Sequence, residues 1–278
     1  MREDSILCAD PHGFHRMRYV EWGDPHNPRV LVCVHGLTRN ARDFDYFAER
    51  LADAYRVVCP DIAGRGRSEW LRVKSDYTYP VYCTDMAALI GKLGAETVDW
   101  VGTSMGGIIG MILASLPGSP LRKLVLNDVG SVVPKAAQER ILQYVGKEAA
   151  FESLEALESA MRSVSPFGEL SDEHWRHLAL HCAKQDEQGR WRFRYDPDIG
   201  ANFVNQAVDD VDLRGYWNQV RGPVLVVRGE QSDLLTRENL EEMKRRPHTE
   251  AYEVPRTGHP PMLMNDTQVV RIRRFLLG

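Results

Sequence analysis

The chain has 278 residues, of which 43% are hydrophobic and 27% charged, and its formal net charge is −4. A chain of this length can bury a sizeable core, and the small negative charge offers no basic field to a nucleic-acid backbone or an anionic membrane surface. We therefore expect a globular protein that acts on a small molecule, with no nucleic-acid or membrane partner. Composition leaves its oligomeric state open.

The cysteine content favours a reducing compartment. The cysteines are odd in number, show no Cys-x-x-Cys spacing, and partly lie inside apolar runs where a thiol behaves as a small hydrophobic group; they are Cys8, Cys33, Cys59, Cys83 and Cys182. The first twenty residues lack the apolar stretch of a secretion signal, and no apolar run approaches membrane-spanning length. We therefore expect a cytoplasmic protein.

Short runs rich in β-branched residues alternate with segments of helical periodicity along most of the chain. Several of the apolar runs are continuous rather than alternating, which is typical of strands covered on both faces. This pattern predicts an α/β fold with a mostly parallel sheet and a leading hairpin strand at 12–24. The predicted strands are 29–36, 55–61, 97–102, 123–130, 223–230 and 250–255, and the clearest helices are 41–53, 78–94 and 236–246.

The alternation stops after residue 130 and resumes near residue 222. The intervening segments have amphipathic helical periodicity, with a short strand predicted within 190–203. No low-complexity linker flanks them, so we expect a helical cap on the sheet rather than an independent domain. The predicted division is a core of 1–133 and 213–278 with a cap at 134–212.

A glycine-rich turn, "GTSMG" (102–106), follows one predicted strand and precedes a helix. A dinucleotide fold uses the same order of elements, and Asp128 closes the next strand about where a ribose-binding acid falls. However, that fingerprint requires glycine at its third position, which Ser104 occupies here, and no Lys-Ser/Thr pair forms a P-loop. The pattern G-x-S-x-G instead matches a nucleophile elbow, in which a tight turn projects a serine above the sheet.

A serine nucleophile needs a base, an acid that orients the base, and donors for the oxyanion. His259 lies in the loop after the last predicted strand, and Asp233 lies just past the strand at 223–230. We predict that Ser104, Asp233 and His259 form the triad, in that chain order. The backbone N–H groups of Leu37 and Met105 are the predicted oxyanion donors.

These motifs, in this order, resemble the α/β-hydrolase superfamily, in its branch of small serine esterases with a helical cap. The resemblance rests on His35-Gly36, "DIAGRGRSEW" (61–70), the elbow, "NDVG" (127–130), "GEQSD" (229–233) and "TGHPPML" (257–263). It implies an eight-stranded, mostly parallel sheet with helices on both faces, and chemistry without a cofactor or metal. Some members of the family place the triad acid after the preceding strand, so Asp128 remains a rival to Asp233, and Glu230 is a further candidate.

The expected activity is hydrolysis of carboxylic esters of small or medium acyl groups through an acyl-enzyme on Ser104. A serine at this position argues against the dehalogenases and epoxide hydrolases of the superfamily, which use an aspartate. The Ser-Met-Gly-Gly elbow also resembles carbon–carbon bond hydrolases of dienoate ring-cleavage products, which use much the same triad. Cap residues that hold a substrate carboxylate would favour this alternative, and the candidates are Arg190, Arg192 and Arg194. Perhydrolysis and a non-catalytic receptor on the same fold remain open.

Other residues have competing interpretations. His35 is usually structural in the resembled family. Three histidines share one helical face, an arrangement that can bind zinc, but no further ligand completes the set, so we predict solvated side chains and no metal; they are His174, His177 and His181. Four apolar cap residues either line the pocket or pack the cap helices: Phe151, Met161, Phe167 and Trp191.

Overall fold

The computed structural model describes residues 1–147, 149–200 and 209–278. Its centre is an eight-stranded sheet with the order β1-β2-β4-β3-β5-β6-β11-β12. The first three strands of this order pair antiparallel and the remaining neighbours pair parallel. The strands are β1 (Arg2–Asp10), β2 (Gly13–Trp22), β3 (Val30–Val34), β4 (Arg56–Pro60), β5 (Val98–Thr103), β6 (Leu121–Asn127), β11 (Val224–Gly229) and β12 (Thr249–Val254). The predicted α/β fold, its eight-stranded sheet and the leading hairpin are confirmed.

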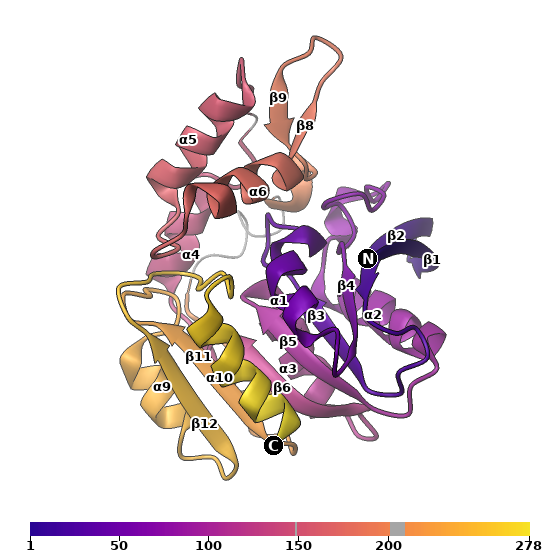
Figure 1. Cartoon of the computed structure of the whole chain (residues 1–278), viewed down its shortest axis with the longest axis vertical. Coiled ribbons are helices and arrows are strands. Elements are labelled where there is room, and N and C mark those ends of the chain that lie inside the picture. Colours follow the sequence, from indigo (N-terminus) through magenta and orange to yellow (C-terminus); the bar gives the residue numbers. More distant parts are fainter. Residues whose placement is uncertain (148, 201–208) are drawn as a thin grey trace.

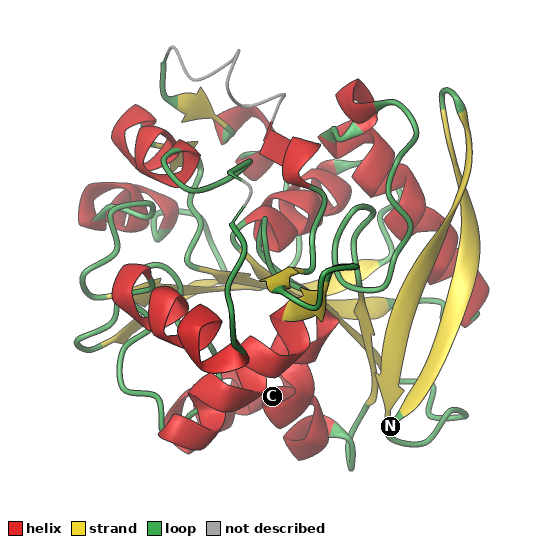
Figure 2. Ribbon diagram, turned by 90° about the horizontal axis from the view of Figure 1, so that it is seen from above, coloured by secondary structure: helices red, strands yellow, loops and turns green. Residues whose placement is uncertain are grey.

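Helices cover both faces of the sheet, as Figure 2 shows from above. In β3, Val30 and Val32 belong to the hydrophobic cluster that contains α2 and α3, whereas Leu31 and Cys33 belong to the cluster on the opposite face with α1 and α10. Because both faces are buried, these strands read as continuous apolar runs. The helices of the core are α1 (Asp45–Leu51), α2 (Tyr79–Leu93), α3 (Met105–Ser115), α8 (Arg214–Trp217), α9 (Arg237–Met243) and α10 (Asp266–Leu277).

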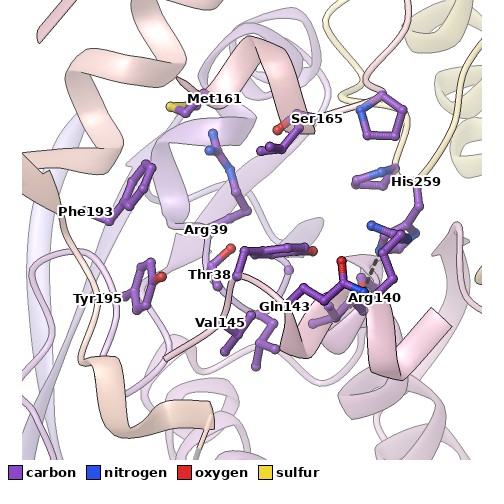
Figure 3. Close-up of a pocket in the computed structure, with 18 of the residues that line it drawn as sticks. Thr38, Arg39, Arg140, Gln143, Val145, Met161, Ser165, Phe193, Tyr195 and His259 are labelled. Carbon is purple, nitrogen blue, oxygen red and sulfur yellow. Dashed lines mark hydrogen bonds between the residues drawn. The ribbon is translucent and has the colours of Figure 1, made fainter. Parts of the chain in front are cut away.

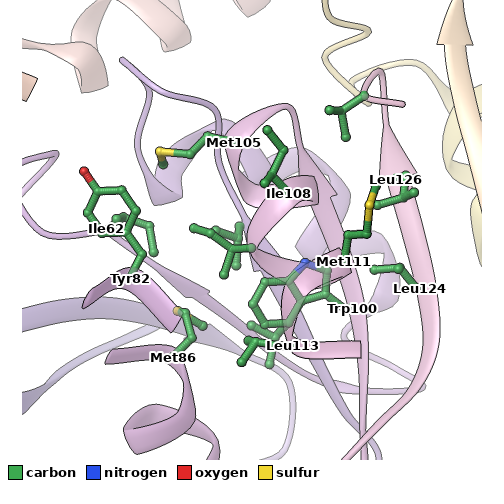
Figure 4. Packing of buried hydrophobic residues seen from close by; sticks show 14 of the residues in the cluster. Ile62, Tyr82, Met86, Trp100, Met105, Ile108, Met111, Leu113, Leu124 and Leu126 are labelled. Carbon is green, nitrogen blue, oxygen red and sulfur yellow. The ribbon is translucent and has the colours of Figure 1, made fainter. Parts of the chain in front are cut away.

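Trp100, on β5, fixes α3 against the sheet (Figure 4). Its side chain is fully buried, and the indole N–H donates a hydrogen bond of 3.0 Å to the carbonyl oxygen of Gly106. A buried indole N–H needs such a partner, and α3 supplies one through its first turn. This contact therefore fixes the start of α3, and with it the turn between β5 and α3, relative to β5.

The segment inserted between β6 and β11 lies beyond one end of the sheet (Figure 1). It has its own hydrophobic cluster, which also takes in Met262 and Met264 from the loop before α10. Residues 148 and 201–208 of the predicted cap, and with them 201–203 of the predicted strand region, lie outside the described residues. The elements of the segment are α4 (Lys135–Leu142), α5 (Leu154–Val164), α6 (Asp172–Cys182), β8 (Ala183–Gln185) and β9 (Trp191–Phe193).

The remaining elements are short. An antiparallel pair of two-residue strands joins the chain where it leaves and re-enters the sheet region, since Val133 pairs with Val211. None of the described helices is both long enough and apolar enough to cross a membrane. All five cysteines are free thiols. The short elements are β7 (Val132–Val133), β10 (Val211–Asp212), and the 3-10 turns η1 (Ala41–Phe44), η2 (Lys74–Asp76) and η3 (Pro197–Gly200).

Candidate active site

Ser104 occupies a strained turn between β5 and α3. Its φ of 52° and ψ of −115° lie outside the regions that non-glycine residues ordinarily adopt. The flanking glycines permit this turn because a Cβ on Gly102 would lie 2.2 Å from the Gly106 carbonyl oxygen, and one on Gly106 would lie 2.1 Å from the Val34 carbonyl oxygen. The G-x-S-x-G spacing is therefore a packing requirement, and it places the half-buried Ser104 at the end of β5.

Ser104, His259 and Asp128 form one hydrogen-bonded chain. The His259 Nε2 atom lies 3.0 Å from the Ser104 Oγ atom, and its Nδ1 atom lies 2.9 Å from the Asp128 Oδ2 atom. The side chain of Asp128 is completely buried and that of His259 is 8% exposed. A carboxylate on Nδ1 directs the unprotonated Nε2 toward the hydroxyl, which is the arrangement needed to remove its proton.

The predicted pairing of Asp233 with His259 is not found. The Asp233 side chain is 47% exposed and forms two hydrogen bonds with Arg140 on α4, of 2.5 Å from Nε and 2.9 Å from Nη2. Burial raises the pKa of this carboxyl, but the hydrogen bond and positive charge of Arg140 outweigh burial and leave its pKa below the usual range. The Asp233 carboxylate therefore binds Arg140 of the inserted segment, and Asp128 is the carboxylate beside the imidazole of His259.

The sheet order explains this correction. Asp128 follows β6, which lies directly beside β5, whereas Asp233 follows β11 by four residues and lies one strand further away. Asp128 also holds its own loop, because its Oδ1 atom accepts a hydrogen bond of 2.9 Å from the Gly229 N–H. The sequence left Asp128 open as a rival to Asp233, because some members of the resembled family place the triad acid after this strand. Glu230, the third candidate, accepts instead from the Arg256 N–H at 2.7 Å.

The two predicted oxyanion donors flank the serine from different elements. Leu37 follows β3, which pairs with β5, and Met105 opens α3. Among the described residues, neither N–H has a protein hydrogen-bond partner. The first N–H groups of a helix are unpaired in general and point toward negative charge, so Met105 is suited to an oxyanion by its position.

His35 joins two loops, and among the described residues its hydrogen bonds go to no member of the triad. Its Nε2 atom accepts a hydrogen bond of 3.0 Å from the Ile62 N–H, and its Nδ1 atom lies 2.7 Å from the Gly36 carbonyl oxygen. Because Nε2 must accept, the ring is neutral with its proton on Nδ1. Complete burial lowers the pKa of His35 to about 3, with nearby arginines also lowering it.

This burial predicts a loss of stability in acid. In the unfolded chain His35 takes up a proton below its ordinary pKa of 6.5, whereas in the folded chain it does so only near pH 3. The folded state is therefore stabilised above pH 6.5 and progressively loses that stability as the pH falls toward 3. Between pH 6.5 and 5 we expect His35 to remove about 1.5 kcal/mol of the free energy of unfolding. Urea unfolding at both pH values should show this decrease in the wild type and a smaller one in His35→Asn, and equal decreases would contradict it.

The histidines of α6 do not act as one group. His174 packs edge-on against Tyr46 at 5.3 Å, while the rings of His177 and His181 lie 4.5 Å apart. The latter two gather with Asp45 so that one ligand atom from each lies within 4.8 Å of the others. Asp45 is also bound by the Arg42 Nε atom at 2.6 Å, and this positive charge opposes a cation at the same place.

A cavity of about 320 Å³ opens above Ser104 and His259 (Figure 3). Its walls come from the residues after β3, from α4 and α5, and from the segment after β9. Of the four apolar cap residues considered from sequence, Met161 and Phe167 line it, whereas Phe151 and Trp191 pair with each other through backbone hydrogen bonds of 2.8 Å. Its further apolar lining includes Ile141, Val145, Val164, Phe193 and Tyr195.

The charged groups among the described lining residues of this cavity are all cationic. Arg39, Arg140 and Lys147 line it, and no carboxylate is among the described lining residues. The arginines proposed from sequence lie elsewhere and do not line it. Arg190 and Arg192 bind Asp186, and the Arg194 Nε atom donates to the Ala183 carbonyl oxygen at 3.0 Å. No local pattern in the sequence marked the three cations, because they reach the cavity from separate segments.

The chain belongs to the alpha/beta hydrolase family, because the model of that family matches residues 31–272. It is 47% identical to a 3-hydroxybutyrate-oligomer hydrolase of Cupriavidus necator over 98% of this chain and 97% of the relative. It is also 28% identical to an esterase of Mycobacterium tuberculosis, over 82% of this chain and 74% of that protein. Among solved structures, a protein from Rickettsia typhi superposes with a TM-score of 0.94 at 33% identity, covering 100% of this chain and 99% of that one. An alpha/beta hydrolase from Novosphingobium aromaticivorans gives a TM-score of 0.87 at 34% identity, over 99% and 98%.

Proposed function

We propose that the chain cleaves carboxylic esters of small or medium acyl groups through an acyl-enzyme on Ser104, with His259 as base and Asp128 as the orienting acid. The observation that carries this proposal is the continuous hydrogen-bonded chain from Ser104 Oγ through the imidazole to a completely buried carboxylate. The chain belongs to the alpha/beta hydrolase family and is similar to an oligomer hydrolase and an esterase, which makes it a carboxylic-ester hydrolase. This class of enzyme agrees with the proposal.

In the first half of the reaction, His259 Nε2 takes the hydroxyl proton as Ser104 Oγ attacks the ester carbonyl carbon. Asp128 stabilises the imidazolium that forms, and the N–H groups of Leu37 and Met105 receive the negative carbonyl oxygen. His259 then gives the proton to the departing alcohol oxygen. In the second half a water molecule, deprotonated by His259, attacks the acyl carbon and releases Ser104.

For the substrate, we propose a short oligoester of a hydroxy acid. The relative at 47% identity carries the name 3-hydroxybutyrate-oligomer hydrolase and is matched along nearly its whole length. The cavity agrees with such a substrate because its described lining is mainly apolar, as suits a methyl-bearing chain, and the charged groups of that lining are cationic, as suits an acid terminus. We further propose that the inserted segment at 134–212 acts as the cap that shapes this cavity.

A carbon–carbon bond hydrolase of dienoate products is the second candidate, because a dienoate carboxylate would also suit the cations of the cavity. The two are separated by supplying p-nitrophenyl esters from acetate to octanoate, the 3-hydroxybutyrate dimer and a dienoate ring-cleavage product to the purified protein. We expect turnover of the esters and dimer, with the shorter acyl chains preferred, and no cleavage of the dienoate. Cleavage of the dienoate without ester turnover would overturn the proposal.

A further inference from the structure

Arg140 and Arg39 are both oriented by an aspartate while they line the catalytic cavity. Arg140 donates through Nε and Nη2 to Asp233, and Arg39 donates through the same two atoms to Asp43 at 2.7 and 2.6 Å. Since a guanidinium carries five N–H donors, each arginine keeps donors for a second acceptor. A planar group held in this way is prepared to bind a carboxylate, because little side-chain entropy remains to be lost.

The two arginines lie on different sides of the reacting centre. Arg140 lies beside His259, whereas Arg39 extends toward Met161 (Figure 3). Arg140 and His259 also line together a second, adjoining hollow whose wall contains Asp233, whereas Asp233 does not line the catalytic cavity itself. The carboxylate of Asp233 therefore binds Arg140 from the side of the second hollow. On the side of the catalytic cavity, the guanidinium faces no negative group among the described residues.

The position beside His259 is where the leaving alcohol departs, because His259 must deliver the proton to that oxygen. In an oligomer of a 3-hydroxy acid, the alcohol part of the last ester bond carries the free carboxylate, separated from the ester oxygen by only two tetrahedral carbons. A carboxylate on Arg140 would thus place that last ester bond at Ser104.

Resting on the proposed function, we propose that Arg140, positioned by Asp233, binds the free carboxylate of the substrate and directs cleavage to the ester bond nearest the acid end. In this step the bond between Ser104 Oγ and the acyl carbon forms, and the bond between that carbon and the ester oxygen breaks. The released oxygen takes the proton from His259, so a hydroxy-acid monomer leaves with its carboxylate on Arg140. Water then frees the shortened acyl chain, whose new carboxylate repeats the cycle.

The test compares the 3-hydroxybutyrate dimer with its methyl ester in the wild type and in Arg140→Met, which keeps an aliphatic side chain without the charge. We expect kcat/KM for the free acid to fall about 10- to 100-fold in the variant, as for the loss of a charge-assisted hydrogen bond. The value for the methyl ester should change less than about threefold. The matched control is Arg176→Met, because Arg176 lies in the same inserted segment, pairs with Glu155, and lines none of the hollows described here. It should leave both substrates unaffected.

The second measurement is the position of the first cut in a 3-hydroxybutyrate trimer whose hydroxyl end is acetylated. The wild type should release free monomer first, and Arg140→Met should release monomer and dimer acid together. Equal losses on the free acid and the methyl ester, or early dimer acid from the wild type, would overturn the inference while leaving ester hydrolysis intact. If no ester is turned over by the wild type, it is the proposed function that fails.

Discussion

Replacing Asp128 by asparagine is expected to lower kcat for a p-nitrophenyl ester by about 10,000-fold, the size of effect known for the acid of such triads. The asparagine amide oxygen can still accept the hydrogen bond from the Gly229 N–H, so the loop keeps its support. However, its neutral amide does not stabilise the imidazolium, and an N–H turned toward Nδ1 selects the tautomer in which Nε2 carries the proton. Ser104 then faces a donor instead of a base.

Asp233→Asn is the matched control, because Asp233 was the acid predicted from sequence. It should reduce kcat for the same uncharged ester by less than about threefold, since its carboxylate binds Arg140 and not the imidazole. Thermal unfolding of both variants separates loss of activity from loss of structure. The reverse ranking of the two variants would restore Asp233 as the acid and contradict the assignment made here.

Gly106→Ala is expected to have the largest effect on the fold around the serine. The new Cβ would lie 2.1 Å from the Val34 carbonyl oxygen and 2.6 Å from its carbonyl carbon, which are backbone atoms of the neighbouring strand. Because α3 is also held there by Trp100, the helix has little freedom to move away. We expect a loss of at least about 3 kcal/mol in the free energy of unfolding, at the upper end of overpacking effects, together with loss of ester turnover.

Gly91→Ala provides the comparison for a glycine without such contacts. Gly91 lies in α2, and nothing is within 4 Å of the Cβ that would be added. Alanine has the higher helix propensity, so this variant should gain about 0.5–1 kcal/mol. Urea unfolding of the two variants measures both shifts, and a neutral Gly106→Ala would show that the turn has more space than the structure gives it.

The sheet could be predicted from the sequence because burial on both faces leaves a strong local signal. The apolar runs at 29–36 and 223–230 contain β3 and β11, whose residues are buried throughout. Boundaries were less accurate where a segment changes its type of helix. The helix predicted at 41–53 consists of the 3-10 turn Ala41–Phe44 followed by α1, with Asn40 accepting from the Arg42 N–H at the start.

Motif and chain order predict Ser104 and His259, which the structure brings within hydrogen-bonding distance, but they do not select the carboxylate beside His259. Asp128 and Asp233 both come after a strand and before His259, so chain order alone admits either. What separates them is sheet order, because β6 lies beside β5 and β11 lies one strand further. This information is three-dimensional, and no spacing along the chain contains it.

The cations of the cavity were missed for a similar reason. The alternating arginines at 190–194 form a local sequence pattern, but Arg190 and Arg192 bind Asp186 within the inserted segment. Arg39 and Arg140 belong to no recognisable sequence pattern, and they line the same cavity only because the loop after β3 and helix α4 both contribute to its wall. Residues that share a cavity through tertiary packing leave no periodic signal.

The most direct test of the account is to trap the covalent intermediate. The protein is mixed with a p-nitrophenyl ester, quenched in acid within the first turnover, digested and mapped by mass spectrometry. We expect one acyl group on the peptide that contains Ser104, bound to the Ser104 hydroxyl and absent in Ser104→Ala. Full ester turnover by Ser104→Ala, or an acyl group bound stoichiometrically to another residue, would contradict it.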